Sequence, residues 1–241
     1  MRQRDISGNL SNWDYISSYS DWMYRSYGKW VGKRVFDVGA GMGRMIRYYV
    51  EQCENVIATD IFSEQVDYMN QMYAQYPQFH AEKLDILADD LERFQGQFDT
   101  VLCINVLEHL ADDEMAVSKM KSLLTPSGHC IIFVPAMSRL YCALDRNVSH
   151  YRRYDKGMVR ELAERNAMKV VHDSYFNFCG IVPYWLKGKR LKNTEKRFSS
   201  DFNEKNTKIY NWAAKILEPI ERAIPPMAGL SEIVILQKTE N

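Results

Sequence analysis

Short apolar runs alternate with amphipathic stretches along most of this 241-residue chain. The runs, which are typical of buried strands, lie at residues 35–38, 55–60, 79–84, 98–104 and 130–134, with a Thr-Pro-Ser-Gly turn at 125–128. Between them, apolar residues recur every three or four positions, which predicts helices at about 42–53, 63–75, 112–124 and 156–164. Strands that alternate with helices are typical of a mostly parallel sheet covered on both faces. The pattern therefore predicts a single α/β domain over residues 1–241.

Two parts of the chain, residues 1–30 and 175–230, depart from this alternation. Ser11 and Asp14 have the spacing of a helix N-cap, and aromatic residues follow them at helical spacing. We expect this first segment to be a helix packed on the edge of the sheet. The second segment combines an aromatic run, several lysines and an amphipathic helix, so we expect a cap inserted before a last strand at 231–238.

Composition and charge narrow the function classes. Apolar residues make up 46% and charged residues 26% of the chain, and 31 basic residues balance 31 acidic ones. Because zero net charge gives no global field for nucleic acid, we expect a small-molecule partner and no nucleic acid. The five cysteines form no Cys-x-x-Cys pair, which favours reduced thiols in the cytoplasm over disulfides and predicts no metal site. We expect neither a signal peptide nor a transmembrane segment, because no apolar run is long enough.

A glycine-rich turn follows the first apolar run. Asp37 precedes Gly39, Gly41 and Gly43, which stand at alternate positions. Glycine is needed where the backbone adopts positive φ or where a ligand approaches it closely. Asp60 ends the second run, 19 residues beyond Gly41. An acid there can accept hydrogen bonds from ribose hydroxyls, whether the cofactor is a dinucleotide or another nucleoside.

The spacing of the glycines distinguishes two cofactor classes. The third glycine arrives one residue earlier than in the dinucleotide fingerprint Gly-x-Gly-x-x-Gly, and an acid stands two residues before the first. With this acid and this glycine spacing, the run from Asp37 to Gly43 resembles the first motif of the class I S-adenosylmethionine (SAM)-dependent methyltransferases. The resemblance implies a Rossmann-like seven-stranded sandwich, mostly parallel with an antiparallel last strand, a helical cap, an N-terminal lid and the cofactor SAM. The cofactor-binding residues that it implies are Asp37, Val38, Gly39, Ala40, Gly41, Asp60, Ile61, Asp85, Ile86, Asn105, Val106 and Leu107.

The segment after the fourth run, Asn105-Val-Leu-Glu-His109-Leu, resembles the corresponding loop of the same family. His109 is the candidate base, because its ordinary pKa is near neutrality and it can accept a proton from the acceptor. The alternative is a histidine that caps a helix or pairs with Glu108. The segment lacks an Asn-Pro-Pro-Tyr motif, which argues further against methylation of nucleic-acid bases.

A polar segment follows the fifth run and resembles a smaller group within the same family. That group is a subgroup of bacterial methyltransferases, and the residues that carry the resemblance are Leu-Tyr141, Leu-Asp145 and the run His150-Tyr-Arg-Arg-Tyr154. On this interpretation His150 and Tyr154 face the methyl-transfer site, while Tyr141, Arg152 and Arg153 bind an acceptor that carries a carboxylate or phosphate. The alternative is structural, with Arg152 or Arg153 paired internally with Asp145 or Asp155.

The predicted function is transfer of the SAM methyl group to a heteroatom, most simply oxygen, of a small-molecule or lipid-linked, glycan-type acceptor. The aromatic run and lysines of residues 175–230 also suit peripheral contact with an anionic membrane. Two alternatives stay open: an NAD-binding oxidoreductase, and a SAM-binding protein without transferase activity. The sequence indicates no particular oligomeric state.

Overall fold

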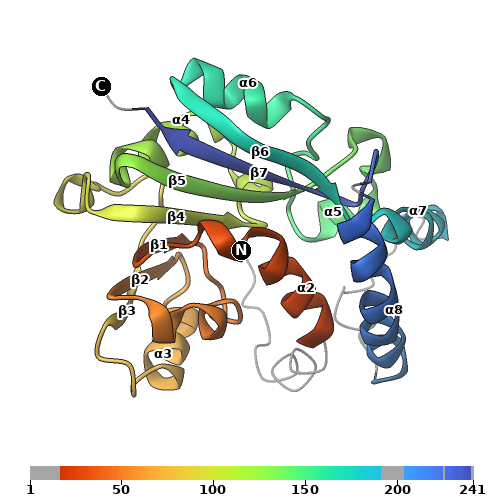
Figure 1. The fold of residues 1–241 in the computed structure, drawn as a ribbon, viewed down its shortest axis with the longest axis horizontal. Helices are drawn as coiled ribbons and strands as arrows, with labels where there is room; N and C mark the ends of the chain where they lie inside the picture. Colours follow the sequence, from red (N-terminus) through yellow and green to blue (C-terminus); the bar gives the residue numbers. More distant parts are fainter. Residues whose placement is uncertain (1–16, 191–203, 225, 240–241) are drawn as a thin grey trace.

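The computed structural model describes residues 17–190, 204–224 and 226–239. One seven-stranded sheet has the order β3-β2-β1-β4-β5-β7-β6, and helices cover both of its faces (Figure 1). The strands are β1 (Arg34–Val38), β2 (Asn55–Asp60), β3 (Phe79–Lys83), β4 (Phe98–Ile104), β5 (Leu124–Pro135), β6 (Met168–Phe176) and β7 (Ser231–Lys238). Strands β1 to β5 pair in parallel, whereas β7 runs antiparallel between β5 and β6. The predicted fold class is therefore confirmed.

Two core clusters form, one on each face of the sheet. The α-helices are α2 (Ser17–Tyr27), α3 (Ser63–Met72), α4 (Asp113–Leu123), α5 (Ala143–Asn147), α6 (Met158–Arg165), α7 (Ile181–Arg190) and α8 (Glu204–Ala223). Because successive strand residues point to opposite faces, β1 sends Val35 to the side of α2 and α3, and Phe36 to the side of α4 and α6. Helix α8 lies beside α2 (Figure 1), where Glu218 pairs with Arg25. No helix of the described segments is long and apolar enough to cross a bilayer.

The helix expected at residues 42–53 is replaced by two short 3-10 helices, η3 (Ile46–Tyr48) and η4 (Val50–Gln52). Tyr49 separates them, with a φ of −128° that no α-helix accommodates. Its buried hydroxyl donates to Asp37 Oδ2 at 2.6 Å. We infer that this contact with the end of β1 outweighs the regular helix that the apolar spacing predicted.

The turn expected at residues 125–128 lies inside β5 instead of before it. Phe98 of β4 pairs with Leu124, but Thr100 pairs with His129, so the residues between them form a bulge. Ser127 has a φ of 61° within the bulge. The Thr-Pro-Ser-Gly sequence does interrupt the regular backbone at residues 125–128, but β5 continues on both sides of the interruption.

Of the N-terminal segment, the structure describes residues 17–30, which include α2. Ser11 and Asp14, the predicted N-cap residues, lie outside the described residues. Trp22 and Tyr27 are buried in the core cluster on the α2 face. The Trp22 ring lies 4.3 Å from that of Phe176, between centroids. These aromatic residues pack on the sheet, as the structural interpretation expected, and a lid role for residues 1–30 stays a prediction.

Candidate active site

The turn after β1 combines packed and open backbone. Gly39, Gly41 and Gly43 have φ values of 64°, 61° and 71°, which side chains rarely adopt. A Cβ on Gly39 would lie 2.7 Å from Val106, and one on Gly43 would lie 2.9 Å from Met69. At Gly41 the nearest such atom would lie 3.9 Å away. The backbone of Gly41 therefore faces open space, and a ligand can press against it.

Two of the predicted acids meet at this turn. Asp60 Oδ2 accepts from the Gly41 amide at 3.0 Å, and Asp60 Oδ1 accepts from the Phe62 amide at 3.0 Å. Asp37 is 3% exposed; burial raises its pKa to about 7, the Tyr49 hydroxyl opposes the rise, and the negative charge of Asp60 adds to it. The structure thus brings the acids at the ends of β1 and β2 close together, as the sequence predicted.

The third acid, Asp85, lies in the loop after β3. The Leu84 amide donates to the Asp60 carbonyl at 3.0 Å, so this loop follows the end of β2 directly. Asp85 Oδ1 accepts from the Leu87 amide at 2.9 Å. Asp85 is therefore a partly exposed acid held by its own loop, and its contact with the cofactor stays a prediction.

Three predicted cofactor residues turn their side chains into the core. Val38, Ile86 and Leu107 are at most 3% exposed and belong to the core cluster on the α4 and α6 face. The resemblance implied a cofactor contact for Ile86, but in this structure its side chain fills the core. Ile61, at the end of β2, is 46% exposed. It offers the open apolar surface that Ile86 lacks.

The loop after β4 lies against the glycine turn. The Ala40 amide donates to the Thr59 carbonyl at 2.8 Å, and Val106 packs beneath Gly39. Asn105 has a φ of 54°, a conformation that asparagine tolerates better than most residues, and its amide donates to the Phe133 carbonyl. The backbone of residues 105–107 is therefore fixed at the end of the sheet, beside the predicted cofactor site.

This loop continues into the short helix η6 (Leu107–His109), which carries the candidate base. The ring of His109 meets the ring of His150 nearly edge-on, with centroids 4.6 Å apart and an interplanar angle of 82°. Glu108 is fully buried, which raises its pKa to about 8. Its Oε1 lies 3.8 Å from His150 Nε2. Glu108, His109 and His150 thus lie together in one cluster, within which the proposed base and the alternative pairing with Glu108 both stay open.

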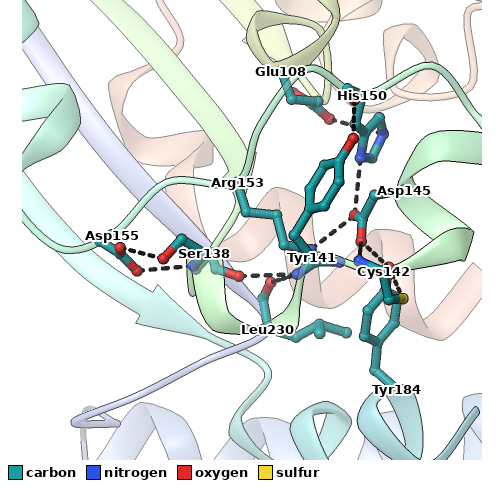
Figure 2. Close-up of polar contacts among 11 residues, drawn as sticks. Glu108, Ser138, Tyr141, Cys142, Asp145, His150, Arg153, Asp155, Tyr184 and Leu230 are labelled. Carbon is teal, nitrogen blue, oxygen red and sulfur yellow. Dashed lines mark hydrogen bonds and ion pairs between the residues drawn. The ribbon is translucent and has the colours of Figure 1, made fainter. Parts of the chain in front are cut away.

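Asp145, the centre of the polar segment, gathers donors from three parts of the chain (Figure 2). Its Oδ1 lies 3.1 Å from His150 Nδ1 and accepts from Arg153 Nε at 2.8 Å. Its Oδ2 accepts from the Tyr184 hydroxyl at 2.8 Å and from the Cys142 amide at 2.9 Å. Burial alone would raise the pKa of Asp145, but these donors, His150 first, lower it. Asp145 is therefore an ionised acceptor that orients His150.

The two arginines and Tyr154 have structural partners. Arg153 is 4% exposed and also donates to the Ala136 carbonyl at 2.9 Å. Tyr154 is fully buried, and its hydroxyl donates to Asp113 Oδ2 at 3.0 Å. Arg152 pairs with the same Asp113 carboxylate at 2.5 Å. The expectations of substrate contact for Arg153 and of catalysis for Tyr154 are wrong in this structure, because both side chains are enclosed, and Arg152 is engaged internally.

Tyr141 is the predicted substrate residue that lies at a cavity. Its hydroxyl donates to the His150 carbonyl at 2.8 Å. The cavity, about 180 Å³, is lined by Arg139, Leu140, Tyr141, Cys142, Trp185, Gly188 and Lys189. It lies between the segment before α5 and one side of α7. Tyr141 thus lies between this cavity and the segment that carries His150, whose ring contacts His109.

Comparison with known proteins finds similarity to methyltransferases. Residues 36–130 match a family model described as a methyltransferase domain. Ubiquinone biosynthesis O-methyltransferase from Erwinia tasmaniensis is 28% identical over 127 residues, which are 49% of this chain and 48% of the relative. The relative of the same name from Acinetobacter baumannii is 28% identical over 121 residues, 49% of this chain and 50% of the relative. The chain thus spans about half the length of the curated relatives it matches.

Solved structures agree over more of the chain. The YcgJ protein of Bacillus subtilis has a TM-score of 0.60 at 16% identity and covers 92% of this chain, with 98% of its own length matched. A SAM-dependent methyltransferase from Archaeoglobus fulgidus has a TM-score of 0.61 at 18% identity, over 92% of this chain and 95% of its own. At such identities these structures show a common fold.

The fold, the glycine turn and the acids are similar to those of the class I SAM-dependent methyltransferases. Residues 36–130 carry the similarity to a methyltransferase domain. The described residues fit SAM as the cofactor, because the backbone of Gly41 is open and the Asp60 carboxylate stands beside it. Asp60 would hold the ribose and Ile61 would cover the adenine.

The three glycines should differ when each is replaced by alanine. Gly43→Ala is expected to lower the free energy of unfolding by about 2–4 kcal/mol, from positive φ and overpacking combined. Gly41→Ala should cost only about 1–2 kcal/mol of strain, yet weaken SAM binding more than 10-fold because the added methyl group enters the open space. Urea denaturation and calorimetric titration measure the two effects. Equal SAM affinity for Gly41→Ala and the parent protein would contradict this assignment.

Proposed function

We propose that the protein transfers the methyl group of SAM to an oxygen atom of a small-molecule acceptor and releases S-adenosylhomocysteine. The observation that carries the proposal is the meeting of three features at the carboxyl ends of β1, β2 and β4. These are the open backbone at Gly41, the Asp60 carboxylate and the loop that ends in His109. The relatives named as ubiquinone O-methyltransferases support oxygen as the acceptor atom.

On the cofactor side, Asp60 is held beside the glycine turn. Its two carboxylate oxygens accept from the Gly41 and Phe62 amides, and the Gln65 side-chain amide lies within hydrogen-bond distance of both oxygens. We expect ribose hydroxyls to donate to the same carboxylate. We expect Asp85 to accept from the exocyclic amine of the adenine. The Asp37 carboxyl and the Tyr49 hydroxyl support the turn from beneath.

On the acceptor side, the protein must align the acceptor and remove a proton. Bound SAM carries its methyl group on a sulfonium sulfur, which supplies the driving force for transfer. A hydroxyl acceptor loses its proton as the carbon–oxygen bond forms, and an imidazole at His109 can accept it. The His150 ring packs against that imidazole nearly edge-on, and Asp145 orients His150. We expect the acceptor to enter from the side of Tyr141 and the neighbouring cavity.

Removing the His109 imidazole should separate catalysis from cofactor binding. His109→Ala is expected to lower kcat for a phenolic or hydroxyl acceptor by about 10²–10⁴-fold, since a general base contributes that much. The Kd for SAM should stay unchanged. His80→Ala, at an exposed position on β3, is the matched control and should retain parent kcat. Full activity of the His109 variant would refute the proposed role.

The class of cofactor is tested by one titration series. Calorimetry of the purified protein with SAM, S-adenosylhomocysteine and NAD should show binding of the first two. Binding of NAD alone would favour the oxidoreductase alternative. Binding of SAM without turnover of any hydroxyl acceptor in a broad panel would favour a SAM-binding protein without transferase activity.

We further propose that the acceptor is lipid-linked or glycan-type. Around α7, Val182 and Trp185 are 62% and 44% exposed, and Lys189 lies over the Trp185 ring at 3.7 Å. On α8, Trp212 and Ile220 are 67% and 54% exposed. Exposed rings beside lysines suit contact with a bilayer that contains anionic lipid. Such contact would bring the cavity close to an acceptor held in the membrane.

The membrane contact is tested by flotation of the protein with liposomes. We expect binding to vesicles that contain anionic phospholipid and weaker binding to neutral vesicles, because lysines add about 1 kcal/mol each near an anionic surface. Trp185→Ser with Val182→Ser should reduce flotation, while Met72→Ser, an exposed apolar control on α3, should not. Absence of binding to either kind of vesicle would end this part of the proposal.

A further inference from the structure

Glu108, His109 and His150 form a cluster whose geometry suits the binding of a metal ion as well as proton transfer. Each of these side chains offers one ligand atom, and the three atoms lie within 4.8 Å of one another. Two of the residues come from η6 and the third from the loop after α5. Tetrahedral ligands at metal–nitrogen distances of about 2.0–2.1 Å lie ~3.3–3.4 Å apart. Because the three atoms lie within 4.8 Å of one another, none of them needs to approach another by more than about 1.5 Å to bind one ion.

The Glu108 carboxylate is the strongest indication that this cluster can hold a cation. The side chain is fully buried, and neither of its oxygens has a hydrogen-bond partner among the described residues. A buried carboxylate without a partner is costly, so such groups in folded proteins are normally paired or coordinate a metal. Arg153, the nearest buried cation of this region, is taken up by Asp145 and by the Ala136 carbonyl. A bound cation would satisfy both free oxygens.

His150 is already oriented as a ligand. Asp145 accepts from the Arg153 guanidinium, the Tyr184 hydroxyl and the Cys142 amide, so the carboxylate acts as an acceptor and His150 Nδ1 must donate to it. That tautomer leaves the lone pair on Nε2, which lies 3.8 Å from Glu108 Oε1 (Figure 2). A histidine that donates its other nitrogen to a carboxylate is the usual arrangement around protein metal ions.

We propose that Glu108, His109 and His150 bind a divalent first-row transition-metal ion, with Asp145 as the residue that positions His150. Two imidazoles and one carboxylate suit zinc, manganese, iron or cobalt better than magnesium, which prefers oxygen ligands. Three protein ligands leave further positions open.

This inference deepens the proposed function and rests on it for its chemical role. An acceptor hydroxyl in an open position would bind through its oxygen, and the metal charge would favour loss of its proton to bulk water. The oxygen lone pair then forms the bond to the methyl carbon as the carbon–sulfur bond breaks. The products are a methyl ether and the neutral thioether S-adenosylhomocysteine. In this arrangement His109 acts as a ligand instead of accepting the proton itself.

The site is tested on the full chain after dialysis against a chelator. Calorimetric titration with Zn²⁺ should show one bound ion per chain. Titration with Co²⁺, a spectroscopic probe, should give the visible absorption bands of a Co²⁺ ion with four or five ligands. Glu108→Gln and His150→Ala should each weaken binding more than 10-fold. His80→Ala is the matched control and should bind as the parent does. Mg²⁺ should bind more weakly than Zn²⁺.

The outcomes separate this inference from the proposed function. No saturable Zn²⁺ or Co²⁺ binding, or equal affinity in the parent, Glu108→Gln and His150→Ala proteins, would overturn the metal site. If chelated protein still methylates a hydroxyl acceptor at the full rate, the metal role fails while the methyltransferase assignment stands. If SAM does not bind at all, the proposed function fails independently of the metal titration. Circular dichroism of Glu108→Gln checks that a loss of binding is not a loss of fold.

Discussion

Replacing Arg153 by alanine is expected to lower the free energy of unfolding by about 3–5 kcal/mol, because the change leaves a buried charge incompletely paired. The Arg153 guanidinium is enclosed, donates to Asp145 Oδ1 at 2.8 Å and lies 4.3 Å from the Tyr184 ring. It also ties this segment to the end of β5 through the Ala136 carbonyl. Without it, the Asp145 carboxylate keeps only His150, Tyr184 and the Cys142 amide. Equilibrium denaturation in urea measures the effect.

Arg152→Ala is the matched control, since the two arginines are neighbours in sequence but differ in environment. The Arg152 side chain is 27% exposed and pairs with Asp113. A partly exposed ion pair contributes about 1 kcal/mol or less. Similar losses of stability in the two variants would contradict the buried role of Arg153.

The second large effect concerns the cofactor. Asp60→Ala is expected to weaken SAM binding about 100-fold or more, because it removes a carboxylate that can accept both ribose hydroxyls. Hydrogen bonds to charged groups contribute about 1.5–3 kcal/mol each, and 100-fold corresponds to about 2.7 kcal/mol. The variant also removes the acceptor of the Gly41 amide, which in the parent protein donates to Asp60. Calorimetric titration with SAM and with S-adenosylhomocysteine measures the change.

The control for this variant is Asp67→Ala on the exposed side of α3. It removes the same charge close to the site without touching the glycine turn, and SAM affinity should stay within about twofold of the parent. Unchanged SAM affinity in Asp60→Ala would remove the ribose assignment and with it the predicted orientation of the cofactor.

Much of the cofactor half of the site could be predicted from local sequence. Asp37, the alternate glycines and Asp60 lie at the ends of apolar runs, and parallel strands bring such ends to one edge of the sheet. The hydrogen bond from the Gly41 amide to Asp60 joins two of these predicted points directly. The same reasoning misjudged Ile86, since an apolar residue after a strand can face a ligand or the core, and spacing does not distinguish the two.

The acceptor half was harder to predict because its contacts join distant segments. The polar run after β5 suggested substrate contact, whereas Arg153 and Tyr154 are enclosed by groups from other elements. Tyr184, which donates to Asp145 from α7, was not singled out at all. No spacing relates it to Asp145. The proposed metal-ligand cluster was not predicted for a related reason: cysteine spacing argued against a metal, and the three residues stand in two separate segments.

The sequence by itself determined the order of the strands and helices, the turn of alternate glycines and the acids at the strand ends. Those features depend on hydrophobic periodicity and backbone conformation, which act over a few residues. Only the tertiary structure decided which side of the chain each polar group faces. The position of Glu108 beside His150, and of Asp145 beneath Arg153, depends on how the loops after β4 and β5 pack together. Burial and electrostatics are properties of that packing, so no local pattern records them.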